Sequence, residues 1–215
     1  INIEDIINIE DIINIEDIIN NIYSFLHYVD NNQDLNESDL LLVDAGCEFK
    51  MYASDITRTF PINGKFSDAQ REIYDLVLSA QKSAIQSIRP GVSSNKPHET
   101  ACQIITDGLI KLGIMKSPED LTKFYMHNTG HWLGLDVHDV GSKLVNGEFR
   151  EFKSGMVTTV EPGIYIRRDD KIDPKYWGIG VRIEDDVLVT DKGNHVLSQK
   201  AAKEINEIEQ LMSRQ

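Results

Sequence analysis

The sequence predicts an α+β fold, because segments with the two-residue period of strands are grouped around segments with the period of helices. Strand-like runs occupy residues 43–60, 156–166 and 179–190, and helical runs lie between them and after them. The chain has 215 residues, 40% of them hydrophobic, which is enough for one sizeable core. Size therefore requires no second domain.

Composition argues against several classes of partner. The formal net charge of −13 disfavours nucleic acid, because phosphate binding needs clustered Lys and Arg. The sequence has no run of about 18 apolar residues, so we expect no membrane association. The two cysteines, Cys47 and Cys102, form no C-x-x-C motif, which indicates reduced thiols in a cytoplasmic protein.

The opening residues are a tandem repeat, in which 1–20 read INIEDI three times and then IN. A six-residue unit is too short for a solenoid, and its isoleucines fit both a strand and a helix, so its structure is left open. We interpret 1–20 as a low-complexity segment and 21–215 as the folded part of the chain.

The first strand-like run, VDAGCEFKMYASDITRTF at 43–60, predicts two strands joined by a short turn. Two acids, Asp44 and Asp55, interrupt its apolar pattern. A carboxylate on the core face of a strand costs on the order of several kcal/mol unless it is protonated, paired with a cation or bound to a metal.

Helix signals follow this run. Ser67 and Gln70 have the spacing of a capping box, apolar residues then recur at helical spacing, and a Pro-Gly pair at 90–91 ends the helix. A second helix is predicted over 97–111 and a last amphipathic helix over 201–214. We interpret these helices as cover for the core.

The stretch MHNTGHWLGLDVHDVG at 126–141 contains three of the six histidines of the chain. One histidine among apolar residues is usually a hydrogen-bonded core residue. His127, His131 and His138, however, are spaced by glycines and accompanied by acids. This pattern favours metal binding or catalysis.

Two further acids interrupt strand-like runs, in TTVEPGIY and GIGVRIEDDVLVT. Solvent-facing edge positions would explain each acid separately, whereas a shared counter-charge explains them together. The second interpretation assigns one set of ligands for two divalent cations: Asp44, Asp55, His131, Glu161 and Glu184. Oxygen-rich ligation with one imidazole favours Mn²⁺, and Co²⁺, Zn²⁺ and Fe²⁺ are left open.

Other polar residues are expected at the surface. They include the acidic pairs at 169–170 and 185–186, and His98 near the start of the second predicted helix.

The sequence contains four informative blocks: LLVDAGCEFKMYASDITRTFPINGKFSDAQREIYDLVL, MHNTGHWLGLDVHDVG, TTVEPGIYI and GIGVRIEDDVLVT. In order, spacing and flanking residues they resemble the catalytic domain of bacterial Xaa-Pro aminopeptidases, also called aminopeptidase P. The resemblance covers residues 22–212 and implies the pita-bread fold. Family members carry a longer amino-terminal part where this chain has the INIEDI repeat, so we expect the first half of the fold to be incomplete.

The resemblance also implies roles for the metal ligands. Asp55 and Glu184 would each bridge the two ions, Asp44 would be a further ligand, and His131 with Glu161 would complete the shell of one ion.

Accessory roles follow from the same resemblance. His27, His127 and His138 would handle substrate, and Arg182 would fix the ligand carboxylates. In the mechanism that we infer, Glu161 accepts a proton from the attacking water and passes it to the proline nitrogen, while His138 stabilises the oxyanion.

The expected substrates are peptides with proline in the second position, a preference that comes only from the resemblance. The alternatives are a prolidase-type dipeptidase, a catalytically silent module that binds peptides, and an inactive chain with an incomplete fold. A homo-oligomer is left open.

Overall fold

The computed structural model describes residues 17–20 and 34–213, and the predicted strand pair at 43–60 is present in it. Strands β2 (Leu40–Ala45) and β5 (Ile56–Pro61) pair antiparallel, with Asp44 opposite Thr57. The connection between them is itself a hairpin, β3 (Glu48–Phe49) and β4 (Tyr52–Ala53). Strand β1 (Asp17–Asn20), at the end of the repeat, pairs antiparallel with the other edge of β2.

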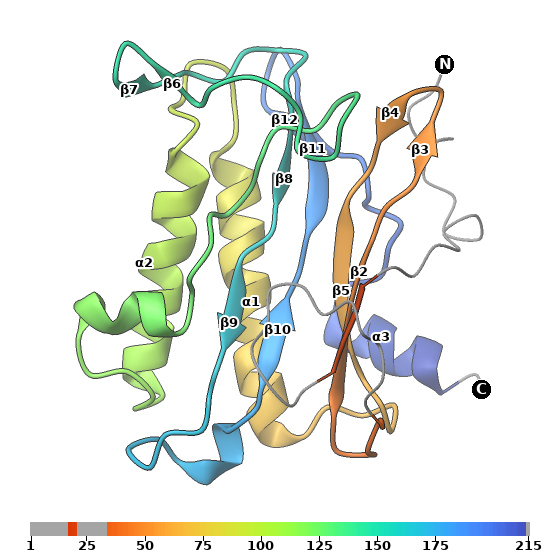
Figure 1. Cartoon of the computed structure of the whole chain (residues 1–215), viewed down its shortest axis with the longest axis vertical. Helices are drawn as coiled ribbons and strands as arrows, with labels where there is room; N and C mark the ends of the chain where they lie inside the picture. Colours follow the sequence, from red (N-terminus) through yellow and green to blue (C-terminus); the bar gives the residue numbers. More distant parts are fainter. Residues whose placement is uncertain (1–16, 21–33, 214–215) are drawn as a thin grey trace.

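Two long helices follow and lie side by side on one side of the strands (Figure 1). The predicted capping box begins α1 (Asp68–Ser87), because the Ser67 side chain accepts from the Gln70 backbone and the Gln70 side chain accepts from the Ser67 backbone. Helix α2 (Lys96–Lys111) has a proline in its first turn. A short 3₁₀ helix, η3 (Pro118–Lys123), leads from α2 toward the histidine-containing stretch.

Each carboxyl-terminal strand-like run forms two strands, and each break falls at an acid of the predicted ligand set. Glu161 separates β8 (Val157–Val160) from β9 (Gly163–Tyr165), and Glu184 separates β10 (Gly180–Arg182) from β11 (Asp185–Val189). Strand β9 pairs with β10, while β11 lies between β8 and β12 (Asn194–Val196). A second 3₁₀ helix, η4 (Pro174–Tyr176), lies between β9 and β10.

A backbone hydrogen bond joins the two groups of strands. The Glu184 N–H donates to the Thr57 carbonyl at 3.1 Å, so β5 lies beside the junction of β10 and β11. Asp55 and Glu184 therefore lie in neighbouring parts of the structure, although they are 129 positions apart in the sequence.

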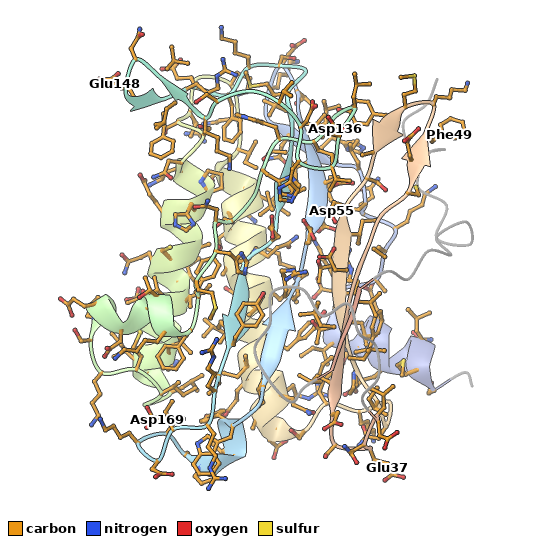
Figure 2. The ribbon with its side chains drawn as sticks, in the orientation of Figure 1. Glu37, Phe49, Asp55, Asp136, Glu148 and Asp169 are labelled. Atoms are coloured by element: carbon orange, nitrogen blue, oxygen red, sulfur yellow. The ribbon has the colours of Figure 1, made fainter. Side chains whose placement is uncertain are left out.

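The main core lies between the helices and the strands. Ile73 and Val77 of α1 and Ile164 and Val181 of the strands are fully buried in one cluster. This burial of apolar area is the main stabilising contribution to the fold. In Figure 2 the acid Asp55 lies between the strands, whereas Asp169 and Glu148 lie at the periphery of the molecule.

The remaining elements are short. Strands β6 (Leu144–Val145) and β7 (Glu148–Phe149) form an exposed hairpin. Helix α3 (Ile205–Met212) begins later than the predicted 201–214, because the capping box is formed by Glu204 and Glu207. Among the described residues, no helix has the length and apolar character needed to cross a membrane.

The expectation of surface positions is wrong for one acidic pair. Asp169 and Asp170 are exposed, but Asp185 and Asp186 are 0% and 1% exposed. Burial raises the pKa of Asp185, but Arg58 and Lys203 outweigh it and hold the net pKa below its usual value. His98 is also partly buried, with Nδ1 2.9 Å from the Thr129 hydroxyl.

Candidate metal centre

The predicted site residues within the described part of the chain line one cleft of about 750 Å³. The cleft lies between the end of the β2–β5 pair and the histidine-containing stretch 127–138. The predicted residues that line it are Asp44, Asp55, His127, His131, His138, Glu161, Arg182 and Glu184. The remaining one, His27, lies outside the described residues.

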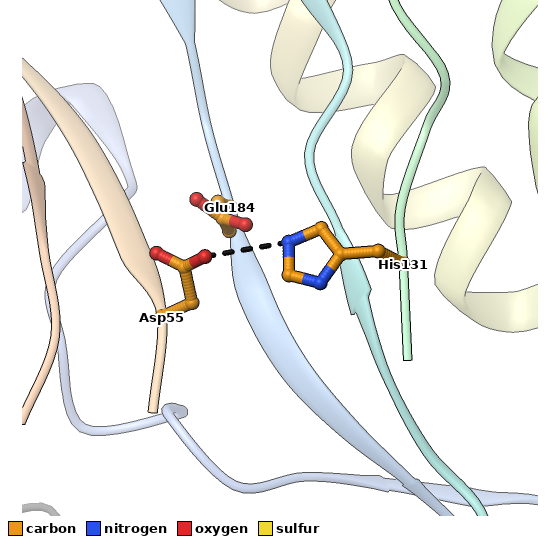
Figure 3. Close-up of side chains that lie close together, drawn as sticks. All are labelled: Asp55, His131 and Glu184. Atoms are coloured by element: carbon orange, nitrogen blue, oxygen red, sulfur yellow. Dashed lines mark ion pairs between the residues drawn. The ribbon is translucent and has the colours of Figure 1, made fainter. Parts of the chain in front are cut away.

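His131 lies at the middle of this group of side chains. Its Nε2 is 3.3 Å from Asp55 Oδ2 (Figure 3). The same nitrogen is 3.6 Å from Glu161 Oε1. Its Nδ1 donates to the Trp132 carbonyl at 3.0 Å. With Nδ1 committed to this bond, Nε2 is the nitrogen left to bind a metal ion, which it does when the ring is neutral.

Three of the predicted ligands are close enough to share one ion. One ligand atom from each of Asp55, His131 and Glu184 lies within 4.8 Å of the other two. Glu161 adjoins this group through His131. Asp44 lies beside it and is paired through Oδ2 with Arg182.

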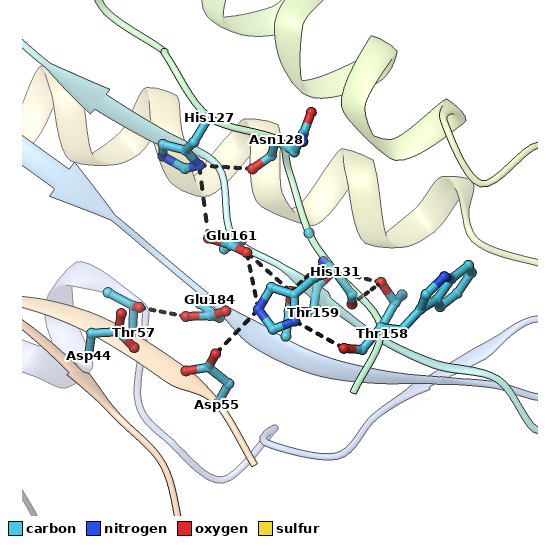
Figure 4. A network of polar contacts seen from close by, with 12 residues as sticks. Asp44, Asp55, Thr57, His127, Asn128, His131, Thr158, Thr159, Glu161 and Glu184 are labelled. Atoms are coloured by element: carbon cyan, nitrogen blue, oxygen red, sulfur yellow. Dashed lines mark hydrogen bonds and ion pairs between the residues drawn. The ribbon is translucent and has the colours of Figure 1, made fainter. Parts of the chain in front are cut away.

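Glu184 provides the test of whether these residues fit a cation. The residue is 1% exposed, and its Oε2 accepts from the Thr57 hydroxyl at 2.6 Å (Figure 4). Its Oε1 is buried and has no hydrogen-bond partner among residues 17–20 and 34–213. An unsatisfied buried carboxylate oxygen facing other carboxylates is expensive without a cation, so this donor set fits a divalent metal.

The electrostatics of the cleft agree with this interpretation. The pKa of Glu161 is raised to about 7, mainly by burial and also by Asp55 and Asp44, against the lowering by Arg182 and His131. Burial also raises the pKa of Glu184 well above its usual value, with additions from Glu161 and Asp55. Burial lowers the pKa of His131, but the hydrogen bond to Asp55 and neighbouring charges produce a net rise. These carboxylates repel one another and require positive charge.

Arg182 is a buried cation that pairs with one of the predicted ligands. It is 3% exposed, forms an ion pair with Asp44, and donates from Nε to the Thr57 hydroxyl at 3.1 Å. Its Nη1 also donates to the Tyr165 hydroxyl at 3.3 Å. Arg182 therefore holds Asp44 and, through Thr57, the side chain of Glu184.

The two accessory histidines differ in their surroundings. His127 donates from Nδ1 to the Asn128 carbonyl at 2.8 Å, and its Nε2 lies 3.0 Å from the Tyr165 hydroxyl. The His138 ring stacks on His131, with centroids 4.0 Å apart and planes at 23°. His138 is exposed on the open side of the cleft, where it can meet a bound molecule.

Local backbone features place His131 and Glu161. The His131 N–H donates to the Thr159 hydroxyl at 3.0 Å, and the same hydroxyl donates to Glu161 Oε1 at 3.2 Å. A Cβ at Gly130 would lie 2.0 Å from the Thr159 carbonyl oxygen, so only glycine permits this approach. Pro162 follows Glu161 and cannot extend the ladder of β8.

Three residues of this region were missed in the sequence. Thr57 and Tyr165 appear as ordinary strand formers, and nothing in their local pattern distinguishes them. Asp186 accepts the Asp55 N–H at 3.2 Å, and its other oxygen is buried without a partner among the described residues. The DD dipeptide after Glu184 was the available signal, since an acid in an apolar run is unusual.

Comparisons with known proteins identify relatives of this chain. The model of metallopeptidase family M24 matches residues 18–191. The chain is 54% identical over 195 residues to an Xaa-Pro aminopeptidase of Haemophilus influenzae and 48% identical over 196 residues to one of Escherichia coli. Each alignment covers 87% of this chain, and they cover 45% and 44% of those proteins.

Solved structures give the same result. Pseudomonas aeruginosa aminopeptidase PepP is 50% identical with a TM-score of 0.85, covering 88% of this chain and 45% of that chain. A variant of Escherichia coli aminopeptidase P in complex with substrate is 47% identical with a TM-score of 0.83, covering 88% and 44%. The chain therefore spans less than half the length of these relatives.

Proposed function

Because the chain belongs to metallopeptidase family M24 and has its pita-bread fold, we propose that it is an Xaa-Pro aminopeptidase that uses two divalent metal ions. The observation that carries this proposal is the approach of Asp55, His131 and Glu184 ligand atoms to within 4.8 Å in a cleft that Glu161 also lines. The reaction would release the amino-terminal residue that precedes a proline.

We assign the ions to a ligand set of five residues: Asp44, Asp55, His131, Glu161 and Glu184. Four carboxylates balance the charge of two divalent ions, and the set is oxygen-rich with one imidazole and no thiolate, which favours Mn²⁺. Bound ions of this kind lower the pKa of a coordinated water and polarise a carbonyl group.

The residues of the cleft would supply the remaining chemistry. Glu161, which lines the cleft beside His131, would accept a proton from the attacking water and return it to the proline nitrogen. His138 would donate a hydrogen bond to the oxyanion from its exposed position in the cleft. His127 would position substrate, and the acids would bind the free amino terminus of the peptide.

The proposal also covers the cellular compartment of the protein. Cys47 and Cys102 are free thiols, which supports a reducing compartment, and we propose the cytoplasm. The expected partner is a peptide with proline in its second position.

The test is release of the amino-terminal residue from an Xaa-Pro-Xaa tripeptide by the purified chain, measured with added Mn²⁺ and after chelation. We expect Mn²⁺-dependent release that Glu161→Ala abolishes. The matched control is Glu148→Ala, which removes an exposed carboxylate on the β6–β7 hairpin and should leave the rate unchanged.

The substrate panel separates the alternatives. Cleavage of an Xaa-Pro dipeptide but not the tripeptide would replace the proposal with a dipeptidase. Folded protein that binds Mn²⁺ and the tripeptide without releasing the residue would identify a binding module.

A further inference from the structure

A buried ion pair lies behind the metal ligands and takes no part in the chemistry proposed above. Arg58 Nη2 is 2.7 Å from Asp185 Oδ1, and the two side chains are 6% and 0% exposed. Arg58 belongs to β5, which starts immediately after Asp55, and Asp185 directly follows Glu184. The ion pair therefore connects the two segments that carry Asp55 and Glu184.

All five N–H groups of the Arg58 guanidinium have acceptors. Nη1 donates to the carbonyls of Thr57 and Glu184, Nη2 donates to Asp185 and to the Ala201 carbonyl, and Nε donates to the Ala202 carbonyl. A planar fork with five donors is needed for this set, and a lysine with three donors cannot replace it.

Asp185 holds the fork in place. Its Oδ1 accepts from Arg58 and from the Ser198 hydroxyl at 2.6 Å, and its Oδ2 accepts from Gln81 at 2.7 Å and Lys203 at 2.5 Å. Gln81 lies in α1, so the network ties the strands at the site to the helix behind them.

We propose that Arg58 is a positioning residue for the metal centre, which sets the separation of the strands that carry Asp55 and Glu184. Its Nη1 donates to the Glu184 carbonyl and to the Thr57 carbonyl, which also accepts from the Glu184 N–H. The Thr57 hydroxyl in turn holds Glu184 Oε2 at 2.6 Å. A shift of either strand would move ligand oxygens apart, so this role rests on the proposed metal centre.

Whether removing Arg58 weakens or strengthens metal binding distinguishes a positioning role from a purely electrostatic one. Arg58 is a cation near a site for cations, so its charge alone disfavours metal binding. If charge were its whole contribution, removing it would strengthen metal binding. Positioning has the opposite consequence, because misplaced ligands bind the ion more weakly.

The experiment measures the Mn²⁺ dissociation constant by isothermal titration calorimetry for the full chain and its variants. Arg58→Lys keeps the charge and loses the fork, whereas Arg58→Gln loses both. Matched controls are Arg71→Lys and Arg71→Gln, because Arg71 lies on α1 and its guanidinium pairs with Glu209 of α3 at 2.6 Å. Circular dichroism of each metal-free variant reports whether it is folded.

We expect both Arg58 variants to bind Mn²⁺ about tenfold or more weakly, the usual effect of losing a residue that orients ligands, and the Arg71 variants to bind as the wild type does. Unchanged or tighter binding by the Arg58 variants overturns the inference. If Arg58→Gln does not fold, Arg58→Lys decides, and an unfolded Arg58→Lys overturns positioning in favour of a purely structural role. Failure of the wild type to bind Mn²⁺ overturns the metal centre itself.

Discussion

At the scale of single residues, burial and charge are in conflict at Glu184. It is 1% exposed, one of its oxygens has no partner in the described part of the chain, and Glu161 and Asp55 are close enough to raise its pKa further. Without a metal ion the carboxyl group is favoured in its neutral form. The charged form therefore depends on a counter-ion that the described residues around Glu184 do not supply.

This conflict predicts that Glu184→Gln has opposite effects on the melting temperature with and without metal. The amide keeps the shape and the acceptor for Thr57 but carries no charge, so the metal-free variant should melt at or above the wild-type temperature. With Mn²⁺ at about 100 times the wild-type dissociation constant, the wild type gains about 2.7 kcal/mol and the variant should lose most of that gain. Thermal melts with and without Mn²⁺ measure both effects.

The control is Glu148→Gln on the exposed β6–β7 hairpin, which should behave as the wild type does in both melts. An equal Mn²⁺ shift in Glu184→Gln would contradict the assignment of Glu184 as a ligand.

Residue-level prediction identified acids that lie in one cleft where the signal was local, and their role as metal ligands stays a prediction. An acid inside an apolar run is visible in the sequence, and Asp44, Asp55, Glu161 and Glu184 all line the cleft. It failed for Asp185, because its burial depends on Arg58 and on Gln81, which lies 104 positions away. Such a network exists only after the strands and α1 have packed.

At the scale of elements, the helices were predictable, and of the two strand breaks only the one at Glu161 had a signal in the sequence. The capping box of α1 uses neighbours only three residues apart, so Ser67 was identified correctly. The Pro-Gly pair after Glu161 indicates a turn there. The apolar run around Glu184 concealed its break, because one buried strand and two short buried strands have the same pattern. The breaks free these acids from the sheet ladders and let them face the cleft.

The cap of α1 is a measurable part of the stability. Ser67→Ala removes the acceptor for the Gln70 N–H and should lower the free energy of unfolding by about 1 kcal/mol. Ser83→Ala lies inside the same helix and should be neutral or slightly stabilising, because alanine has the higher helix propensity. Urea denaturation of both variants compares them, and equal losses would contradict the capping role.

The close packing of residues 129–133 against β8 gives a second prediction at this scale, for the effect of a side chain at Gly130. Gly130→Ala places a methyl group against the Thr159 carbonyl and should lower the free energy of unfolding by about 1–3 kcal/mol, while displacing His131 and weakening Mn²⁺ binding. Gly193→Ala, where a Cβ meets no atom within 4 Å, is the matched control and should leave both quantities nearly unchanged. Wild-type Mn²⁺ affinity in a folded Gly130→Ala would show that this approach does not place His131.

At the scale of the whole molecule, the metal centre joins parts of the chain that are distant in sequence. Asp55 lies before α1, His131 lies after α2, and Glu184 lies between β10 and β11. The hydrophobic core packs the helices against the strands, and the carboxylates gathered at the cleft oppose this compact state in a chain with a net charge of −13. Bound cations would remove that repulsion and connect all three segments.

Metal binding should therefore stabilise the whole fold in one transition. At about 100 times its dissociation constant, Mn²⁺ adds about 2.7 kcal/mol, which corresponds to a rise of about 5–10 °C in the melting temperature of a chain of this size. Differential scanning calorimetry should show a single peak that moves up with Mn²⁺ and returns with a chelator. An ion bound by all three segments must be released when any one of them unfolds. If calorimetry instead shows two transitions and Mn²⁺ moves only one of them, the ion stabilises one segment alone.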